Sequence, residues 1–245
     1  MARISEATTT TSQAFQNKIR QKINEFRSFE EAAQYYTTTM YEEFEESIVL
    51  ARLFATVAYG ELPLQNKNFV KLLATSKGVG QLLFDHTPVL SLLGTSGEQP
   101  AWNNRRYSRG HVGIPLISAD FIDAIPMMSR LLRQLGLGLD WIDSADTDIV
   151  KHTMGSMSGV FFVPRPTSEV DARGRKIIAA QDFVTKYHVK TVFGFGGGYL
   201  GSSTFSVTII FLRETLNESQ VRQFVANMAF FKPITVNLVK RKLFT

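Results

Sequence analysis

The spacing of hydrophobic residues predicts two helices at the start of the chain. The first apolar stripe recurs at intervals of four, four and three residues, as on one face of a helix. It consists of Phe15, Ile19, Ile23 and Phe26. Ser28 followed by Glu31 is a capping-box pattern that opens the second helix. We expect that helix to bury the stripe formed by Ala32, Ala33, Tyr36, Met40 and Phe44.

Runs of apolar and β-branched residues in the middle of the chain predict strands. They cover residues 47–58, 89–93, 111–117, 159–163, 189–195 and 205–212. We expect the first strand to be central and the last two to form a hairpin with its tip at residues 199–203. In that hairpin Gly196, Gly197 and Gly198 are assigned to the turn. The Gly, Pro, Asn and Ser content of residues 94–110 predicts a long loop without regular structure.

Helical patterns alternate with these strands and return at the end of the chain. Residues 66–74 and 118–135 have helical spacing, and Pro126 should break the second of them. The acidic residues 141–151 are expected to form an exposed connection. Asn217 and Gln220 form a further capping box, and the helix that follows should bend at Pro233. The tail through Leu238, Val239, Leu243 and Phe244 stays apolar, like a helix that meets a partner.

Composition excludes several classes of function. The chain has 245 residues and no cysteine, so disulfides, thiolate metal sites and cysteine nucleophiles are absent. No apolar run approaches the roughly 20 residues of a membrane span, and the start has no signal-peptide core. The net charge is +5 but the cations are spread out, and no nucleic-acid-binding motif occurs. We therefore expect a cytoplasmic protein without a membrane span or a nucleic-acid partner.

Four segments carry a resemblance to a known family. They are residues 94–116 (GTSGEQPAWNNRRYSRGHVGIPL), 125–136 (IPMMSRLLRQLG), 178–184 (IAAQDFV) and 192–211 (VFGFGGGYLGSSTFSVTIIF). Together they resemble an uncharacterised bacterial GAF-like signal-input family, often found upstream of histidine kinases or other output domains. The likeness covers roughly residues 30–240. It implies an α+β fold of GAF or PAS type, with a mixed, mainly antiparallel sheet between N- and C-terminal helices.

The resemblance also sets the expected organisation and function. Residues 1–27 form an N-terminal helix that is a candidate for dimerisation, and residues 28–245 form a single sensor domain. We expect a non-catalytic sensory module that binds a small anionic or planar ligand and signals to a partner protein. The terminal helices would form a homodimer through Phe15, Ile19, Ile23 and Phe26 with Leu238, Val239 and Leu243. A ligand-free docking scaffold is the main alternative, and a small hydrolase is another.

Loop 94–111 contains the main candidate for a ligand site. An indole, amide groups, guanidinium groups and an imidazole occur there without an acidic residue between Gln99 and Ala119, a composition suited to an anion or a planar group. The candidate residues are Trp102, Asn103, Asn104, Arg105, Arg106 and His111. The alternative is structural: the arginines would pair with distant acids and Trp102 would anchor the loop.

The remaining candidates have simpler structural explanations. His86, His111, His152 and His188 are too widely spaced for a metal pair, and His111 is the residue to test as a haem ligand. No cofactor follows from the sequence. Ser156, Ser158 and Asp148 near His152 lack the GxSxG context of a nucleophile. Gln181, Asp182 and Lys186 could face a cavity, but helix capping and solvation explain them equally well.

Overall fold

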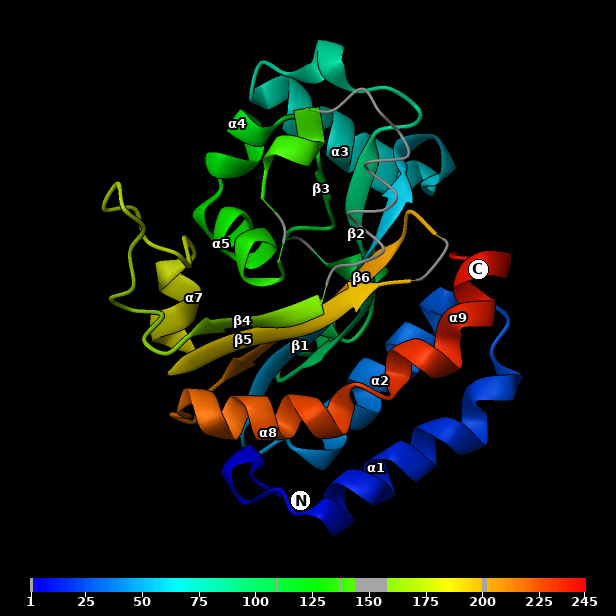
Figure 1. Ribbon diagram of the computed structural model, residues 1–245, viewed down its shortest axis with the longest axis vertical. Coiled ribbons are helices and arrows are strands. Elements are labelled where there is room, and N and C mark those ends of the chain that lie inside the picture. The colour runs from blue at the N-terminus through cyan, green and yellow to red at the C-terminus, as the bar shows by residue number, and fades with distance from the viewer. Residues whose placement is uncertain (1, 109, 137, 144–157, 200–201) are drawn as a thin grey trace.

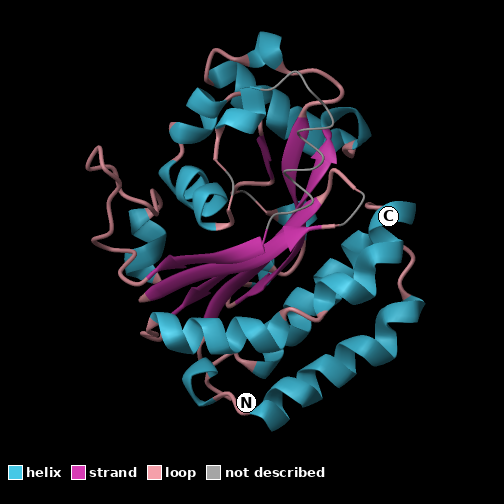
Figure 2. Ribbon diagram, in the orientation of Figure 1, coloured by secondary structure: helices cyan, strands magenta, loops and turns pink. Residues whose placement is uncertain are grey.

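An antiparallel sheet forms the middle layer of the molecule, with helices on both faces (Figures 1 and 2). The computed structural model describes residues 2–108, 110–136, 138–143, 158–199 and 202–245. The six strands lie in the order β3-β2-β1-β6-β5-β4, and all pairs are antiparallel. Their bounds are β1 Ile48–Ala58, β2 Pro88–Gly97, β3 Gly113–Pro115, β4 Ser158–Val163, β5 Thr191–Gly198 and β6 Phe205–Leu212.

The helices divide between the two faces of the sheet. Helices α2, α8 and α9 cover one face, and α1 lies outside them against α2 and α8 (Figure 1). Helices α4, α5 and α7 lie over the other face, and α3 packs beside β3. Their bounds are α1 Thr9–Lys22, α2 Phe29–Glu43, α3 Leu64–Ser76, α4 Ala119–Asp123, α5 Pro126–Gln134, α7 Gln181–Lys186, α8 Glu218–Met228 and α9 Phe231–Arg241.

The predicted fold class is confirmed. Strand β1 is central, and alternate side chains along it serve two hydrophobic cores. Ala51 and Leu53 face the core under α2, α8 and α9, whereas Leu50 and Phe54 face the core under α5. The Asn217 capping box is formed, and the break at Pro126 separates α4 from α5.

The apolar stripes of the terminal helices are used within the chain. Phe15 and Ile19 are fully buried, and the Phe15 ring packs edge-on against Tyr36 and Phe230. Leu238 and Val239 are also buried. The expectation that these four residues lie at a dimer contact is therefore wrong, because the helices bury them against their own neighbours.

Two glycine-rich segments predicted to be irregular are strands instead. Strand β2 continues to Gly97, and Gly196–Gly198 belong to β5 rather than to the hairpin turn. At Gly94 a Cβ atom would overlap the backbone of Ala33 on α2, so the glycine permits close helix–sheet packing. Tertiary contact, which local composition does not reveal, explains this difference.

Two smaller expectations also need correction. Trp141 is buried in the core under α5, although it begins the segment predicted to be exposed; residues 144–151 of that segment lie outside the described residues. The last helix does not bend at Pro233. It ends at Met228, and α9 starts anew at Phe231 with Pro233 in its first turn, where the missing N–H of proline is tolerated.

Candidate functional site

Trp102 fastens the predicted ligand loop to helix α7. Its ring centroid lies 5.7 Å from that of Phe183 and 4.8 Å from that of Tyr187, both in edge-on geometry. Edge-to-face aromatic pairs add stability beyond the burial of their area. The indole is therefore engaged with protein rings on the α5 side of the sheet.

The two asparagines of the loop also bond within the chain. The Asn103 side-chain oxygen accepts hydrogen bonds from the Gly97 backbone N–H at 2.8 Å and from the Ser96 hydroxyl at 3.2 Å. The Asn104 side-chain oxygen accepts from the Arg106 backbone N–H at 2.9 Å. These bonds shape the turn that follows β2.

Arg105 is a buried structural residue. Its side chain is 5% exposed, and its Nε donates to Glu30 Oε1 at 2.6 Å. Its Nη1 donates to Asn66 Oδ1 at 3.1 Å, and the guanidinium lies 5.0 Å from the centre of the Phe244 ring. The second Glu30 oxygen accepts from the Thr245 backbone N–H at 3.0 Å. One carboxylate thus joins α2, the loop and the C-terminal tail.

Arg106 and His111 are more exposed than Arg105 and lie apart from each other. The Arg106 guanidinium is 56% exposed and lies 3.8 Å from Glu30. His111 lies beside Arg52 of β1, whose Nη2 donates to Ser108 Oγ at 2.9 Å. The surrounding protein and the Arg52 charge lower the pKa of His111, although its side chain reaches solvent. Burial likewise lowers the pKa of Arg52 to about 10.

Within the described part of the chain, the predicted site residues divide among three different surroundings. Trp102 contacts α7, Arg105 contacts α2, and His111 lies by β1. Arg105 and Arg106 do line a groove of about 590 Å³ beside α2, but Glu30 and Glu31 line it as well. The contacts of Trp102, Asn103 and Arg105 are those of the structural alternative, and ligand binding at this loop stays a prediction.

The weaker candidates are scattered. His86 stacks on Phe84 with ring centroids 5.6 Å apart, and His188 follows α7 with a positive φ of 53°. Gln181 donates to the Pro166 carbonyl at 3.0 Å. Asp148, His152 and Ser156 lie outside the described residues. Across the part of the chain that is described, no three His, Asp or Glu side chains are grouped as for a metal ion.

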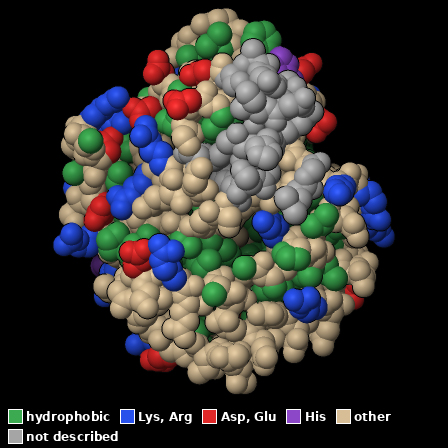
Figure 3. Space-filling view, in the orientation of Figure 1, with side chains coloured by type: hydrophobic (Ala, Val, Ile, Leu, Met, Phe, Trp, Pro, Cys, Tyr) green, Lys and Arg blue, Asp and Glu red, His purple; other side chains and the backbone are tan. Residues whose placement is uncertain are grey.

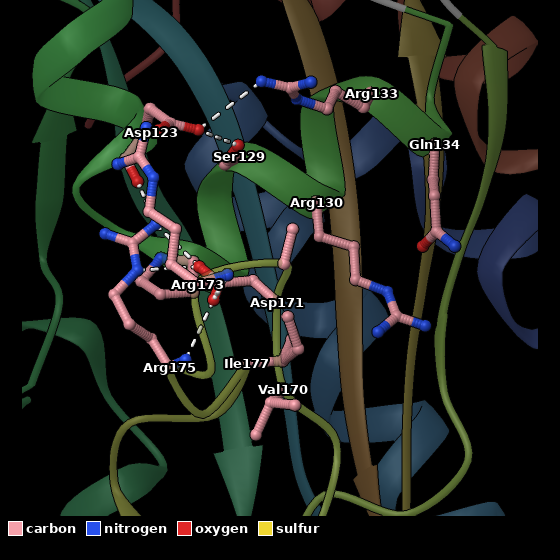
Figure 4. Close-up of a pocket in the computed structure, with 12 residues that line it drawn as sticks. Asp123, Ser129, Arg130, Arg133, Gln134, Val170, Asp171, Arg173, Arg175 and Ile177 are labelled. Carbon is pink, nitrogen blue, oxygen red and sulfur yellow. Dashed lines mark hydrogen bonds and ion pairs between the residues drawn. The ribbon is translucent and has the colours of Figure 1, made fainter.

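A different cleft brings together four arginines from two distant segments. It has a volume of about 400 Å³ and lies between α5 and the turn at residues 170–177 (Figure 4). Arg130 and Arg133 come from α5 and are three residues apart, so they share one side of that helix. Arg173 and Arg175 come from the turn and face them across the cleft.

Asp171 organises the turn that carries two of these arginines. Its Oδ1 accepts the backbone N–H groups of Arg173 and Arg175, both at 2.9 Å, and its Oδ2 accepts Arg175 Nε at 2.7 Å. Desolvation raises the pKa of Asp171, but these hydrogen bonds from Arg175 and Arg173 outweigh it and lower the pKa overall. Gly174 has a φ of +76°, which permits the tight turn between the two arginines.

Asp123, at the end of α4, links the turn to α5. Its carboxylate accepts the Ser129 hydroxyl at 2.9 Å, and pairs with Arg173 at 2.9 Å and with Arg133 at 3.4 Å. Its backbone carbonyl accepts Arg175 Nη2 at 2.7 Å. The turn and the helix are thus held at a defined separation by shared ion pairs, which Figure 4 shows as dashed lines.

The cleft keeps an excess of positive charge and of hydrogen-bond donors. Asp123 and Asp171 line it, and Glu169 pairs with Arg130 at 3.0 Å, so three described carboxylates face four guanidinium groups. The side chains of Arg133 and Arg173 are 61% and 67% exposed. Basic and acidic side chains alternate on this side of the surface, over α5 and α7 (Figure 3). A guanidinium has five N–H donors, so several point at solvent in the cleft.

The sequence contains both halves of this cleft, but the clustering of charges along the chain does not show that they lie together. The segment DARGRK, residues 171–176, combines a turn glycine with three cations and the aspartate that caps them. Arg130 and Arg133 lie on one side of a helix some 40 residues earlier. Only the fold places the two segments opposite each other.

Comparison with known proteins gives a likeness to a solved structure. No family model matches the chain, and no curated protein matches it. Among solved structures, the chain is similar to the phycoerythrobilin-bound GAF domain from a cyanobacterial phytochrome, with a TM-score of 0.46 and 8% sequence identity. The match covers 94% of this chain and 95% of that chain. At that similarity the likeness carries no argument about the fold, the ligand or the activity of this chain.

Within the described ranges, no helix has the length and apolarity needed to cross a lipid bilayer.

Proposed function

We propose that this chain is a non-catalytic regulatory module that binds a small anion, such as a phosphate or polycarboxylate compound, in the arginine cleft. The observation that carries the proposal is the set of four arginines facing one another across about 400 Å³. Guanidinium groups bind carboxylates and phosphates with two parallel hydrogen bonds, which gives both affinity and orientation. The module is of the sensory, GAF-like kind that the sequence resembles.

The ion pairs already present make the cleft suited to reversible binding. Arg133 and Arg173 share the single carboxylate of Asp123, and both remain mostly exposed. An incoming anion can therefore use free donors on both without breaking a buried pair. Ion pairs at such exposure contribute little to stability, so rearranging them costs little.

A path for signalling leads from the cleft to the terminal helices. Helix α5 contacts β4, and β4 contacts α8 on the other face of the sheet. Suppose that α5 and the turn have two arrangements and that the ligand binds one of them more tightly. Binding then shifts the equilibrium toward that arrangement, by a free energy equal to the difference in binding free energy, and α8 shifts with it. We propose that a partner protein responds to this change.

A docking scaffold remains the second candidate, and one observation favours it. Leu64 and Leu72 on α3 are 74% and 72% exposed, which is unusual for leucines within a helix. A homodimer or a partner would use this helix rather than the terminal stripes, which are buried. Replacing Leu72 with Glu should then reduce the mass of the assembly in light scattering.

Calorimetric titration with inorganic pyrophosphate and with citrate tests the main proposal. We expect saturable binding to the wild type and at least a tenfold weaker affinity in the double variant Arg133→Ala, Arg173→Ala. The control with the same loss of charge is the double variant Arg222→Ala, Lys240→Ala, since both residues are exposed and lie on α8 and α9, across the sheet from the cleft. Equal weakening in the control would mean that net charge alone attracts the anions, and the proposal would fail.

A further inference from the structure

A second cavity lies on the opposite face of the sheet, beneath the junction of α8 and α9. Its volume is about 190 Å³, the space of roughly six water molecules. Apolar side chains of Phe195, Val225, Met228 and Phe231 form much of its wall. Figure 3 shows hydrophobic side chains gathered along the line where β4 meets α8 and α9.

The floor of this cavity contains a buried hydroxyl without a hydrogen bond. Tyr36 is fully buried, and its hydroxyl forms no hydrogen bond of normal distance and angle with the described residues, although the Thr208 hydroxyl lies close enough to lower its pKa against the larger effect of burial. Its ring is fixed by stacking on Phe231, with centroids 4.1 Å apart. Leaving a buried hydroxyl unbonded costs about 1–3 kcal/mol. A fixed donor that is costly to leave unpaired is a feature that a ligand can use.

Two further hydroxyls accompany Tyr36. Ser206 and Thr208 are alternate residues of β6, so both face the cavity, and Thr208 is a close polar neighbour of Tyr36. The Thr208 hydroxyl interacts with Tyr36 and the Ser206 hydroxyl with Tyr199, but neither contact has the distance and angle of a normal hydrogen bond in the described part of the chain. Burial raises the pKa of Tyr36, so its hydroxyl keeps its proton and can donate.

The outer end of the cavity is positively charged. Ala229 and Ser158 are exposed and mark the opening, whereas Tyr36 and Thr208 are buried and mark the floor. Lys232 lines the cavity near the opening, is half-buried, and has no ion-pair partner in the described ranges. The N-terminus of α9, which begins at Phe231, has no side-chain cap. Both features favour an anionic group at the opening.

We propose that this cavity binds a small carboxylic acid with a compact apolar body and a polar group at its far end. The carboxylate meets Lys232 and the start of α9, the body lies against Phe195 and Met228, and a hydroxyl or carbonyl bonds with Tyr36 and Thr208. The site is separate from the arginine cleft, which lies across the sheet. A molecule bound here contacts both α8 and α9 and therefore fixes the angle between them.

Three related probes test the two ends of the site separately. They are 4-hydroxybenzoate, benzoate, which lacks the far hydroxyl, and 4-hydroxybenzyl alcohol, which lacks the carboxylate. Titration followed by NMR should show saturable binding of 4-hydroxybenzoate, and about tenfold weaker binding of each of the others. A tenfold change corresponds to about 1.4 kcal/mol.

Two variants should each erase one of these preferences. In Tyr36→Phe the affinity for 4-hydroxybenzoate falls about tenfold, to that for benzoate, whose own affinity is unchanged. In Lys232→Met the affinities for both acids fall, while that for the alcohol is unchanged. Tyr41→Phe on α2 and Lys240→Met on α9 are the matched controls, since neither residue lines the cavity.

The melting temperature distinguishes a ligand site from an internal hydrogen bond. Because the Tyr36 hydroxyl forms no hydrogen bond of normal distance and angle within the described residues, Tyr36→Phe should melt at or above the temperature of the wild type. A clear fall in melting temperature would mean that the hydroxyl is already bonded, and would overturn the proposal. So would the absence of saturable binding of all three probes to the wild type.

Discussion

Arginines occupy two regions of this molecule in opposite ways. In the loop after β2, Arg105 is 5% exposed and uses its guanidinium on Glu30, Asn66 and the Phe244 ring. In the cleft beside α5, Arg133 and Arg173 are 61% and 67% exposed and share one carboxylate. The loop has the cluster that is visible in the sequence, but the cleft has the unused donors. Burial, rather than clustering along the chain, distinguishes an arginine that anchors the fold from one whose donors are free to bind a ligand.

The largest expected effect tests Arg105 as an anchor. Arg105→Ala leaves the Glu30 carboxylate buried without its cation, so unfolding in urea should show a loss of about 3–5 kcal/mol. Arg106→Ala is the adjacent control, and because Arg106 is 56% exposed we expect a loss below about 1 kcal/mol. Similar losses in the two variants would remove the difference between buried and exposed arginines on which the comparison rests.

An intermediate effect is expected at the turn of the cleft. Gly174 has a φ of +76°, and a Cβ atom there would meet no neighbour within 4 Å. Gly174→Ala should therefore cost about 1–2 kcal/mol through backbone strain alone. The same change should weaken pyrophosphate binding, because Arg173 and Arg175 flank the glycine. Thermal unfolding measures the loss of stability, and titration of the same sample measures the pyrophosphate affinity. Unchanged binding would mean that the turn does not take part in the site.

The smallest effect is a pH dependence at Asp171. Because its pKa lies below the usual 3.8 in the folded chain, its stabilising effect is complete above about pH 4. That effect is lost as the pH falls through the lower folded value. The stability difference between the wild type and Asp171→Asn should thus be constant near neutral pH and shrink below about pH 4. Urea unfolding at several pH values checks this, and a difference that grows in acid would contradict the assigned hydrogen bonds.

Local patterns were sufficient for most of the fold. The helical stripe around Phe15, the capping box at Asn217 and the apolar run of β1 each lie within one element, so periodicity and propensity determine them. The glycines of β2 and β5 were misassigned because their role is contact between elements. Gly94 lies against the α2 backbone, and no local pattern records that approach.

The candidate site was less predictable for the same reason. The sequence of loop 94–111 suggests an anion site because its cations are adjacent and no acid lies among them, yet Glu30 reaches Arg105 from 75 residues away. No sequence window contains both halves of the cleft, because Arg130 and Arg133 lie about 40 residues before Arg173 and Arg175. The charge around an arginine depends on which residues the fold brings near it. A sequence window therefore overestimates the free positive charge of the loop and underestimates that of the cleft.

Glu30 also has a consequence for how the molecule opens. Its two oxygens bind the Arg105 side chain and the Thr245 backbone, while its own N–H and that of Phe29 donate to the carbonyls of Leu243 and Lys242. The first turn of α2, the loop and the tail therefore form one cooperative unit, although they are far apart in sequence. Their amide protons should therefore show a common free energy of opening in hydrogen exchange, and any event that releases the tail should also release the loop.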